Sequence, residues 1–331
     1  MALIGIEKLV FGVEDLDLCK KFWRDYGMAV IEETPDHGLY ATTSNAKVEV
    51  RKFGDPALPA AVVEGSTARE TIWAATDQAS VDALAEDLAK DRELRVDDDG
   101  TIHTTDPEGY GIGFRVTERV ELADPGTKYN APGREDRINE LATFYDGATP
   151  RHLAHVVFLV ADNEGTAKFY QDRLGFRLTD AYTDRGKFLR CDGTIDHHNI
   201  FLMHVPGQMG FHHCAFELRD IHEVFGGGLR MNELGWKTHL GPGRHNVTSA
   251  YYWYFRNPSG GAAEYGFDTD RLDDAWEARM IEPTDGAFQR KWGGANRRVD
   301  GESMLHLCGN RNKRSLAVDL KAPEGRALIE K

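Results

Sequence analysis

The sequence of 331 residues is poor in cysteine and has no excess of positive charge. Its cysteines are scattered, and none shows the C-x-x-C spacing of zinc sites or redox motifs. The four positions are Cys19, Cys191, Cys214 and Cys308. Cysteines in this arrangement predict reduced thiols in a cytoplasmic protein. The net charge of −14 argues against nucleic acids and anionic membranes as partners, because both attract basic surfaces.

Long apolar runs are absent as well. No stretch approaches the roughly 18 consecutive apolar residues that a membrane-spanning helix needs. Residues 1–15 carry charges at Glu7, Lys8 and Glu14, which does not fit the apolar core of a signal peptide. We therefore expect neither a membrane span nor a secretion signal. With 41% hydrophobic and 28% charged residues, the composition is that of a globular protein long enough for two domains.

Histidine, by contrast, is concentrated in one part of the chain. Ten of the 13 histidines lie between His152 and His245. Any chemistry that depends on imidazole is therefore expected in this central to late segment.

One order of elements recurs four times: a strand, a helix and three further strands. The copies cover about 5–53, 71–116, 155–204 and 213–267. Alternating β-branched and aromatic residues indicate the strands, and apolar residues every three or four positions indicate the helices. This order predicts an α+β fold of two domains, each built from two βαβββ modules.

The domain boundaries follow from changes in composition. We predict an N-terminal pair of modules at 1–120, a connection at 121–149, a C-terminal pair at 150–270 and an extension at 271–331. The connection is rich in charge, Gly and Pro, and we expect some helix at 134–145. Residues 225–230, reading FGGGLR, lie in a helical pattern, and their glycines predict a distorted or interrupted helix.

The copies can be superimposed by sequence. LAHVVFLVAD at 153–162 matches IEKLVFGVED at 6–15, which pairs His155 with Lys8. NPSGGAAEYG at 257–266 matches DPEGYGIGFR at 106–115, which pairs Glu264 with Gly113. His213 falls opposite 70–72. If these three residues do chemistry, the first two modules lack their counterparts, and the N-terminal half is a scaffold without a metal site.

Residues 244–266 form the most informative segment. His245 is followed by Tyr254 nine residues later and by Glu264 ten residues after that. The intervening NPSGG at 257–261 is a turn sequence, so the flanking segments predict a β-hairpin. A carboxylate among small and aromatic residues near the centre of a strand is costly to bury unless it is paired or binds a metal.

These features resemble the type I extradiol ring-cleavage dioxygenases of the vicinal oxygen chelate superfamily. The resemblance covers about 5–270 and rests most firmly on the motif that runs from His245 through Tyr254 to Glu264, with Asn257-Pro258 between the last two. Trp253 departs from the motif, which has an aliphatic residue there. The resemblance implies paired βαβββ modules whose strands curve around a cavity.

The resemblance also implies roles for individual residues. His155, His213 and Glu264 match the ligands of Fe(II), and Mn(II) is accepted by the same ligand set. His198 matches the acid–base residue, while His245 and Tyr254 match a hydrogen-bonding pair beside the metal. The implied reaction inserts both atoms of O2 into a substituted catechol and gives a muconic semialdehyde-type product. The resemblance further implies a homo-oligomer.

General chemistry agrees with these roles. Two imidazoles and one carboxylate occupy three positions of the metal and leave others open, as in non-haem iron oxygenases. A catechol requires two open positions and O2 a third. A histidine suits proton transfer in both directions, because its ordinary pKa of about 6.5 lies near neutrality.

Two doublets leave a choice within the sequence. Adjacent strand residues point to opposite faces, so only one member of His197-His198 and one of His212-His213 can serve the site. The second member of each doublet is taken from the resemblance. Residues 251–253 are interpreted as packing residues outside the site.

Three other functions remain open at this stage. A glyoxalase or epimerase of the same superfamily would use four protein ligands, which Lys8 and Gly113 do not favour. A keto-acid dioxygenase would share the metal ligands but would not require His198, His245 and Tyr254 together. A non-catalytic ligand-binding or resistance protein would need no metal ligands at all.

Overall fold

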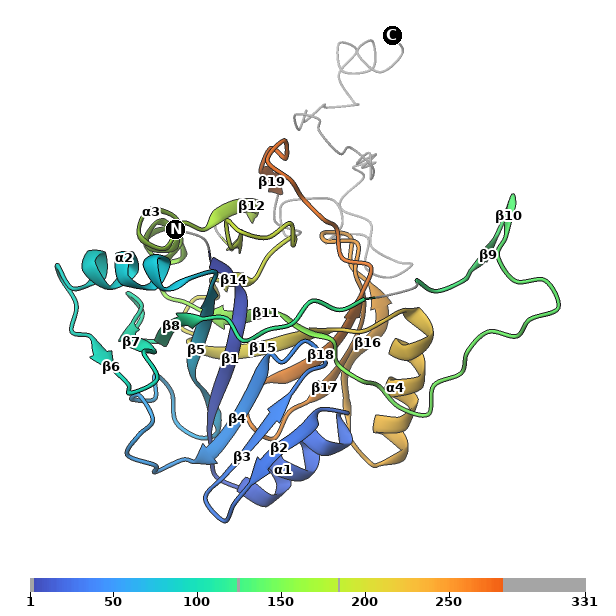
Figure 1. Ribbon diagram of the computed structural model, residues 1–331, viewed down its shortest axis with the longest axis horizontal. Helices are drawn as coiled ribbons and strands as arrows, with labels where there is room; N and C mark the ends of the chain where they lie inside the picture. The colour runs from blue at the N-terminus through green and yellow to red at the C-terminus, as the bar shows by residue number, and fades with distance from the viewer. Residues whose placement is uncertain (1–2, 124–125, 184, 282–331) are drawn as a thin grey trace, which may run out of the picture.

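The computed structural model describes residues 3–123, 126–183 and 185–281. Two large mixed sheets and four helices make up most of this part of the chain (Figure 1). The predicted α+β class is therefore confirmed. The predictions for the extension beyond residue 281 concern residues outside the described part, and the division into two domains stays a prediction.

The N-terminal half contains the first sheet and two helices. Its eight strands are ordered β2-β3-β4-β1-β5-β8-β7-β6. The elements are β1 (Leu3–Val13), α1 (Leu16–Asp25), β2 (Ala29–Glu33), β3 (His37–Ala41), β4 (Lys47–Lys52), β5 (Thr67–Ala75), α2 (Gln78–Leu88), β6 (Arg95–Val96), β7 (Ile102–Thr105) and β8 (Gly111–Val116).

The C-terminal half contains the second sheet and the other two helices. Its nine strands are ordered β16-β17-β18-β15-β11-β14-β13-β12-β19. The elements are β11 (His152–Leu159), α3 (Asn163–Leu174), β12 (Arg177–Tyr182), β13 (Gly186–Arg190), β14 (Ile200–Met203), β15 (Gly210–Glu217), α4 (Ile221–Glu233), β16 (Thr238–Arg244), β17 (Tyr251–Arg256), β18 (Ala262–Phe267) and β19 (Arg279–Ile281).

The two sheets repeat the same pairing. β1 runs parallel to β4 and antiparallel to β5, and β11 runs parallel to β14 and antiparallel to β15. Lys8 lies opposite Ile72, which lies opposite Gly113. His155 lies opposite Ala215, which lies opposite Glu264. Counting two residues back along β5 and β15 then makes Glu70 the counterpart of His213.

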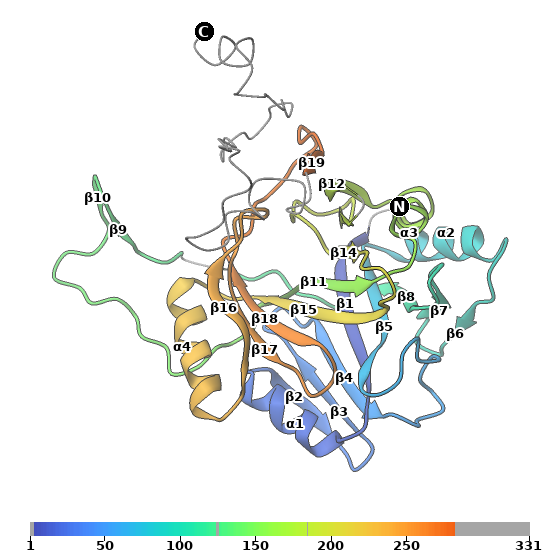
Figure 2. The same ribbon diagram turned by 180° about the vertical axis from the view of Figure 1, so that it is seen from behind.

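The connection between the halves differs from the prediction. Its described residues contain a two-stranded hairpin, β9 (Asn130–Ala131) and β10 (Arg134–Glu135), and no helix. The expectation of helix at 134–145 was wrong, because the apolar residues Ile138, Leu141 and Phe144 are exposed and no packing stabilises a helix there. Figure 2 shows this hairpin projecting away from the sheets.

Helix α4 is continuous, which corrects the prediction of an interrupted helix. Its glycines provide room for close packing. A Cβ at Gly228 would lie 2.1 Å from the Trp253 ring, and one at Gly226 would lie 2.2 Å from the Tyr145 carbonyl oxygen. Trp253 therefore occupies the space above the helix, on the opposite face of β17 from Tyr254.

A single cluster of buried apolar residues extends through both halves. Helix α1 contributes Trp23 and Tyr26, whose rings pack against Phe216 of β15. Tyr26 also stacks on Tyr265 of β18, with ring centroids 4.2 Å apart. The N-terminal half thus covers one face of the strands that carry the late histidines and Glu264.

Candidate metal centre

His155, His213 and Glu264 come from three neighbouring strands, β11, β15 and β18. The strand pairing places His155, Ala215 and Glu264 in one row across the sheet. His213 lies two residues along β15 from Ala215, so its side chain is on the same face. Residues separated by more than 100 positions in the sequence are thereby brought to one point.

The geometry of the three side chains fits one metal ion. The Nε2 atoms of His155 and His213 are 3.2 Å apart. The Oε2 atom of Glu264 is 3.5 Å from the former and 3.4 Å from the latter. Ligand atoms bound at about 2.1 Å and roughly 90° apart lie about 3 Å from one another.

The carboxylate itself supports a bound cation. Glu264 is 2% exposed, and its Oε2 has no hydrogen-bond partner among the described residues. A buried carboxylate oxygen without a donor is costly, and a metal ion would remove the cost. Within the described part of the chain, these three residues are the group of His, Cys, Asp and Glu whose ligand atoms approach closely enough to hold an ion.

The charges of the ligands suit metal binding. Burial lowers the pKa of His213 to about 4, so its imidazole is neutral and able to coordinate at neutral pH. Burial acts against ionisation of Glu264, but the neighbouring rings of His155, His213 and His245 outweigh it and hold the pKa of Glu264 well below its ordinary value. The site therefore presents two imidazoles and one carboxylate.

His245 and Tyr254 lie together beside the carboxylate. Tyr254 is directly opposite Glu264 in the β17–β18 pairing. The Nε2 atom of His245 is 3.0 Å from the Tyr254 hydroxyl and 3.6 Å from Glu264 Oε1. Burial and the nearby charge of Glu264 raise the pKa of Tyr254 well above its ordinary value, so the phenol keeps its proton. It can therefore donate a hydrogen bond to an anionic ligand.

His198 lies on the other side of the ligands, just before β14. Its ring centroid is 4.0 Å from that of His155, and the Phe188 ring stands edge-on to it at 5.0 Å. Burial, and then the nearby His155 and His197, lower the pKa of His198 well below its ordinary value. The imidazole is therefore neutral at neutral pH and can accept a proton.

The structure thus brings all six predicted site residues together. Sequence reasoning missed three of their neighbours. Tyr252 stacks on His245 with ring centroids 4.0 Å apart, although 251–253 were assigned to packing. His197 and Asp180 form a buried hydrogen-bonded pair behind His198. The two-residue period of β17 could have indicated Tyr252, but no sequence signal joins Asp180 to His197.

Comparison with known proteins agrees with the fold. Residues 152–265 match the model of the glyoxalase/bleomycin resistance protein/dioxygenase superfamily. The matched segment begins at β11 and ends in β18, so it contains every residue of the site described above. Residues 280–331 match the model of CoA-transferase family III, and all but the first two of them lie outside the described residues.

Two curated relatives are similar over larger segments. Metapyrocatechase 2 of Cupriavidus necator is 29% identical over 203 residues, which is 60% of this chain and 62% of the relative. The iron-dependent extradiol dioxygenase of Rhodococcus jostii is 29% identical over 221 residues, which is 50% of this chain and 73% of the relative. The chain thus spans about three fifths of the former protein.

Solved structures share the fold. The Mn(II)-bound glyoxalase from Novosphingobium aromaticivorans superimposes with a TM-score of 0.68 at 21% identity, over 85% of this chain and 88% of that one. Among the described residues, no helix is long and apolar enough to cross a membrane. In sequence, the chain is thus similar to extradiol dioxygenases, and its residues 152–265 match the superfamily model that includes dioxygenases.

Proposed function

We propose that the protein is an Fe(II)-dependent extradiol dioxygenase that cleaves the ring of a substituted catechol with O2. The observation that carries the proposal is the buried cluster of His155, His213 and Glu264, whose Oε2 has no other partner. Three protein ligands leave room for a two-oxygen substrate and O2 on one ion. The expected product is a muconic semialdehyde-type compound that contains both oxygen atoms.

Each ligand has a defined task in this proposal. His155 and His213 would bind through Nε2, and Glu264 through Oε2. A divalent ion held there would bring the catechol oxygens and O2 together and make a catechol hydroxyl more acidic. The equivalent positions of the N-terminal half hold Lys8, Glu70 and Gly113, and the carboxylate of Glu70 is already paired with His103 Nδ1 at 2.7 Å.

His198 would move the protons of the reaction. A neutral imidazole beside the ligands can accept the proton of the second catechol hydroxyl and return it to an oxygen of the product. The reaction needs no other reductant, because the four electrons that reduce O2 come from the opened ring. Burial of His198 by Phe188 keeps water from competing for this proton.

Tyr254 and His245 would hold the substrate anion. The hydroxyl of Tyr254 keeps its proton and lies in a hydrogen bond with His245, so it can donate to a catecholate oxygen once substrate enters. A hydrogen bond to a charged acceptor contributes about 1.5–3 kcal/mol. This pair orients the ring and stabilises its negative charge.

The choice of Fe(II) over Mn(II) rests on similarity. One relative is named an iron-dependent extradiol dioxygenase, whereas one solved structure of the same fold holds Mn(II). We further propose that the enzyme acts in the breakdown of aromatic compounds, in the cytoplasm and as a homo-oligomer. Buried free thiols at Cys19, Cys191 and Cys214 agree with a reducing compartment.

The test is a direct assay. The full chain is purified without O2, loaded with Fe(II) or Mn(II) in parallel and mixed with a panel of substituted catechols in air-saturated buffer. We expect O2 uptake that matches the appearance of a yellow ring-opened product, with one metal bound per chain. If no catechol consumes O2 while a hemithioacetal is isomerised without O2, the protein is instead a glyoxalase-type isomerase.

A further inference from the structure

A buried chain of hydrogen bonds runs from Arg279 to His198. The Nε atom of Arg279 donates to Asp180 Oδ1 at 2.8 Å, and its Nη2 donates to Oδ2. Asp180 Oδ2 is 2.9 Å from His197 Nε2, and His197 Nδ1 is 3.1 Å from His198 Nδ1. We propose that Asp180 and His197, held by Arg279, are positioning residues that fix the tautomer and orientation of His198.

The direction of each hydrogen bond follows from chemistry. The Asp180 carboxylate only accepts, so His197 Nε2 carries a hydrogen and donates it. A neutral His197 then has a lone pair on Nδ1, which must accept from a hydrogen on His198 Nδ1. That leaves the lone pair of His198 on Nε2. The remaining nitrogen is therefore a base, which is the form that can take a proton from a substrate.

Arg279 is needed for this assignment. Without it, the carboxylate of Asp180 would favour a second proton on His197, and the charged ring would then donate to His198 Nδ1. His198 would in that case carry its hydrogen on Nε2 and could not accept a proton there. Arg279 compensates the charge of Asp180 through its side chain, and its backbone N–H also donates to Oδ1 at 3.1 Å.

Burial makes the chain of contacts effective. Asp180 and His197 are completely buried, and His198 is 5% exposed. Exchange of tautomers through solvent is therefore hindered. The contact of Arg279 with the Trp276 ring, 4.7 Å from its centroid, and the donation of Trp276 Nε1 to the Thr179 carbonyl hold the guanidinium in place.

The position of Arg279 shows how the site is assembled. It begins β19, which pairs in parallel with β12 at the edge of the sheet and places Arg279 opposite Asp180. The segment that follows the last βαβββ strand thus returns to the catalytic half. The inference rests on the proposed function, because it concerns how His198 serves as a base.

The first test reads the tautomer directly and needs no turnover. The full chain is labelled with ¹⁵N-histidine and loaded with Zn(II), which is diamagnetic, and its ring nitrogens are observed by NMR. His198 is identified by the signal lost in His198→Phe. We expect its hydrogen on Nδ1 in the wild type and on Nε2 in Asp180→Asn, whose amide can donate to His197. A hydrogen on Nε2 in the wild type would overturn the proposal.

The second test is kinetic, on the Fe(II)-loaded enzyme. Asp180→Asn should lower kcat roughly 30- to 100-fold, within the contribution typical of acid–base catalysis, with KM changed less than about threefold. The control is Asp192→Asn, which removes a carboxylate bound to Arg177 on the surface, and it should stay within about twofold of the wild type. Equal kcat in both variants would refute the role of Asp180.

A pair of variants at His197 covers the case in which Asp180→Asn does not fold. His197→Phe fills the same space but cannot accept from His198, so it should lower kcat like Asp180→Asn while the metal stays bound. His197→Asn presents an amide oxygen near the place of Nδ1 and should recover at least about tenfold of that loss. Should the wild type cleave no catechol, the proposed function fails while the NMR result still decides the tautomer.

Discussion

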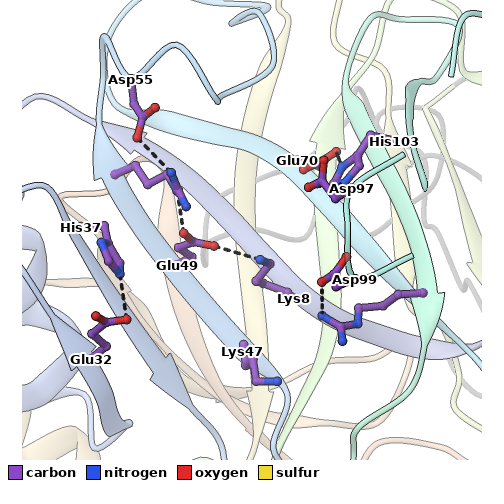
Figure 3. Close-up of polar contacts among 12 residues, drawn as sticks. Lys8, Glu32, His37, Lys47, Glu49, Asp55, Glu70, Asp97, Asp99 and His103 are labelled. Carbon is purple, nitrogen blue, oxygen red and sulfur yellow. Dashed lines mark hydrogen bonds and ion pairs between the residues drawn. The ribbon is translucent and has the colours of Figure 1, made fainter. Parts of the chain in front are cut away.

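The two halves of the protein carry different side chains at three equivalent strand positions. The C-terminal half has His155, His213 and Glu264, whose ligand atoms all lie within 4.8 Å of one another. The N-terminal half has Lys8 and Glu70 on the first two positions and a glycine on the third. In Figure 3, Lys8 turns toward Glu49, and Glu70 lies against His103.

The two clusters differ in whether the buried carboxylate is paired with Lys or Arg side chains of the chain itself. Lys8 Nζ donates to Glu49 Oε2 at 2.9 Å, and the same carboxylate also accepts from Arg51. Burial opposes ionisation of Glu49, but Lys8 and Arg51 outweigh it and lower its pKa. The N-terminal cluster thus contains its own cations. In the C-terminal cluster the ion-pair partners of the carboxylate among the described residues are histidines, with no Lys or Arg, so we expect a cation from outside the chain.

Space at the third position differs as well. A Cβ at Gly113 would lie 3.1 Å from the Ile102 carbonyl oxygen and 3.2 Å from Ile72 Cγ1. Such contacts are tighter than most real ones, so a side chain at this position would require its neighbours to shift by a few tenths of an ångström. The N-terminal sheet is therefore closed around the position that holds Glu264 in the other sheet. A fold can retain the strands of a metal site while neighbouring side chains fill its centre.

The largest expected effect comes from removing the carboxylate that the N-terminal half lacks. Glu264→Ala should reduce bound metal to below about one tenth of the wild-type content and ring cleavage by 1,000-fold or more, because two imidazoles alone hold the ion weakly. Metal analysis after gel filtration measures the first, and O2 uptake the second. Glu233→Ala on the surface of α4 is the control. Full metal occupancy in Glu264→Ala would falsify the ligand assignment.

The next effect separates metal binding from proton transfer. Counting from the paired strands, Ala46 of the N-terminal half is the counterpart of His198. The variant His198→Ala copies that residue. It should keep its iron, because His198 is not one of the three proposed ligands, but its kcat should fall roughly 10²- to 10⁴-fold, the range of acid–base catalysis. Iron content and turnover are measured on one preparation. Iron lost in parallel with activity would mean that His198 acts as a ligand instead.

A change in the N-terminal cluster should affect stability alone. Lys8→Met leaves the buried Glu49 with Arg51 as its remaining cation and should lower the free energy of unfolding by about 1–3 kcal/mol. Metal content and kcat should equal those of the wild type. Urea denaturation and the O2 assay test both statements. A fall in metal content would show that the N-terminal cluster takes part in the site after all.

The last effect depends on pH and concerns the turns that the two halves share. Burial raises the pKa of Asp106 to about 7, whereas Asn257, its counterpart in the other half, cannot ionise. Because the folded-state pKa lies above the unfolded value of about 3.9, the wild type should lose stability as pH rises from about 4 to 7. Asp106→Asn should remove this loss, by about 1–4 kcal/mol at pH 8. Urea denaturation at pH 5 and pH 8 measures it, and an equal gain at both pH values would contradict the assignment.

Much of this arrangement could be predicted from the sequence because it repeats. The matched segments at His155 and Lys8, and at Glu264 and Gly113, define strand positions without any structure. The strand pairing also resolves the uncertain match of His213, because it shows that the counterpart of His213 in the N-terminal half is Glu70. These positions can be predicted from local sequence patterns, because side chains alternate between the two faces of a strand with a period of two residues.

Contacts between distant segments could not be predicted in this way. Asp180 contacts Arg279 because β19 pairs with β12 at the edge of the sheet, and no repeating pattern in the sequence predicts this pairing. From the sequence, the glycines of α4 predicted a distorted or interrupted helix. Their actual role is to allow close packing against Trp253 and the connection between the halves, which the sequence does not show. Packing against remote residues overrides local propensity in both cases.

Trp23 of α1 and Tyr26, which caps the helix, connect the N-terminal half to the strand that carries Glu264. Trp23 donates from Nε1 to Ser259 Oγ at 3.0 Å, in the turn that leads into β18, and the Tyr265 hydroxyl donates to the Tyr26 carbonyl at 2.9 Å. Tyr265 directly follows Glu264 in the chain. The position of Glu264 therefore depends on side chains of the N-terminal half as well as on its own sheet.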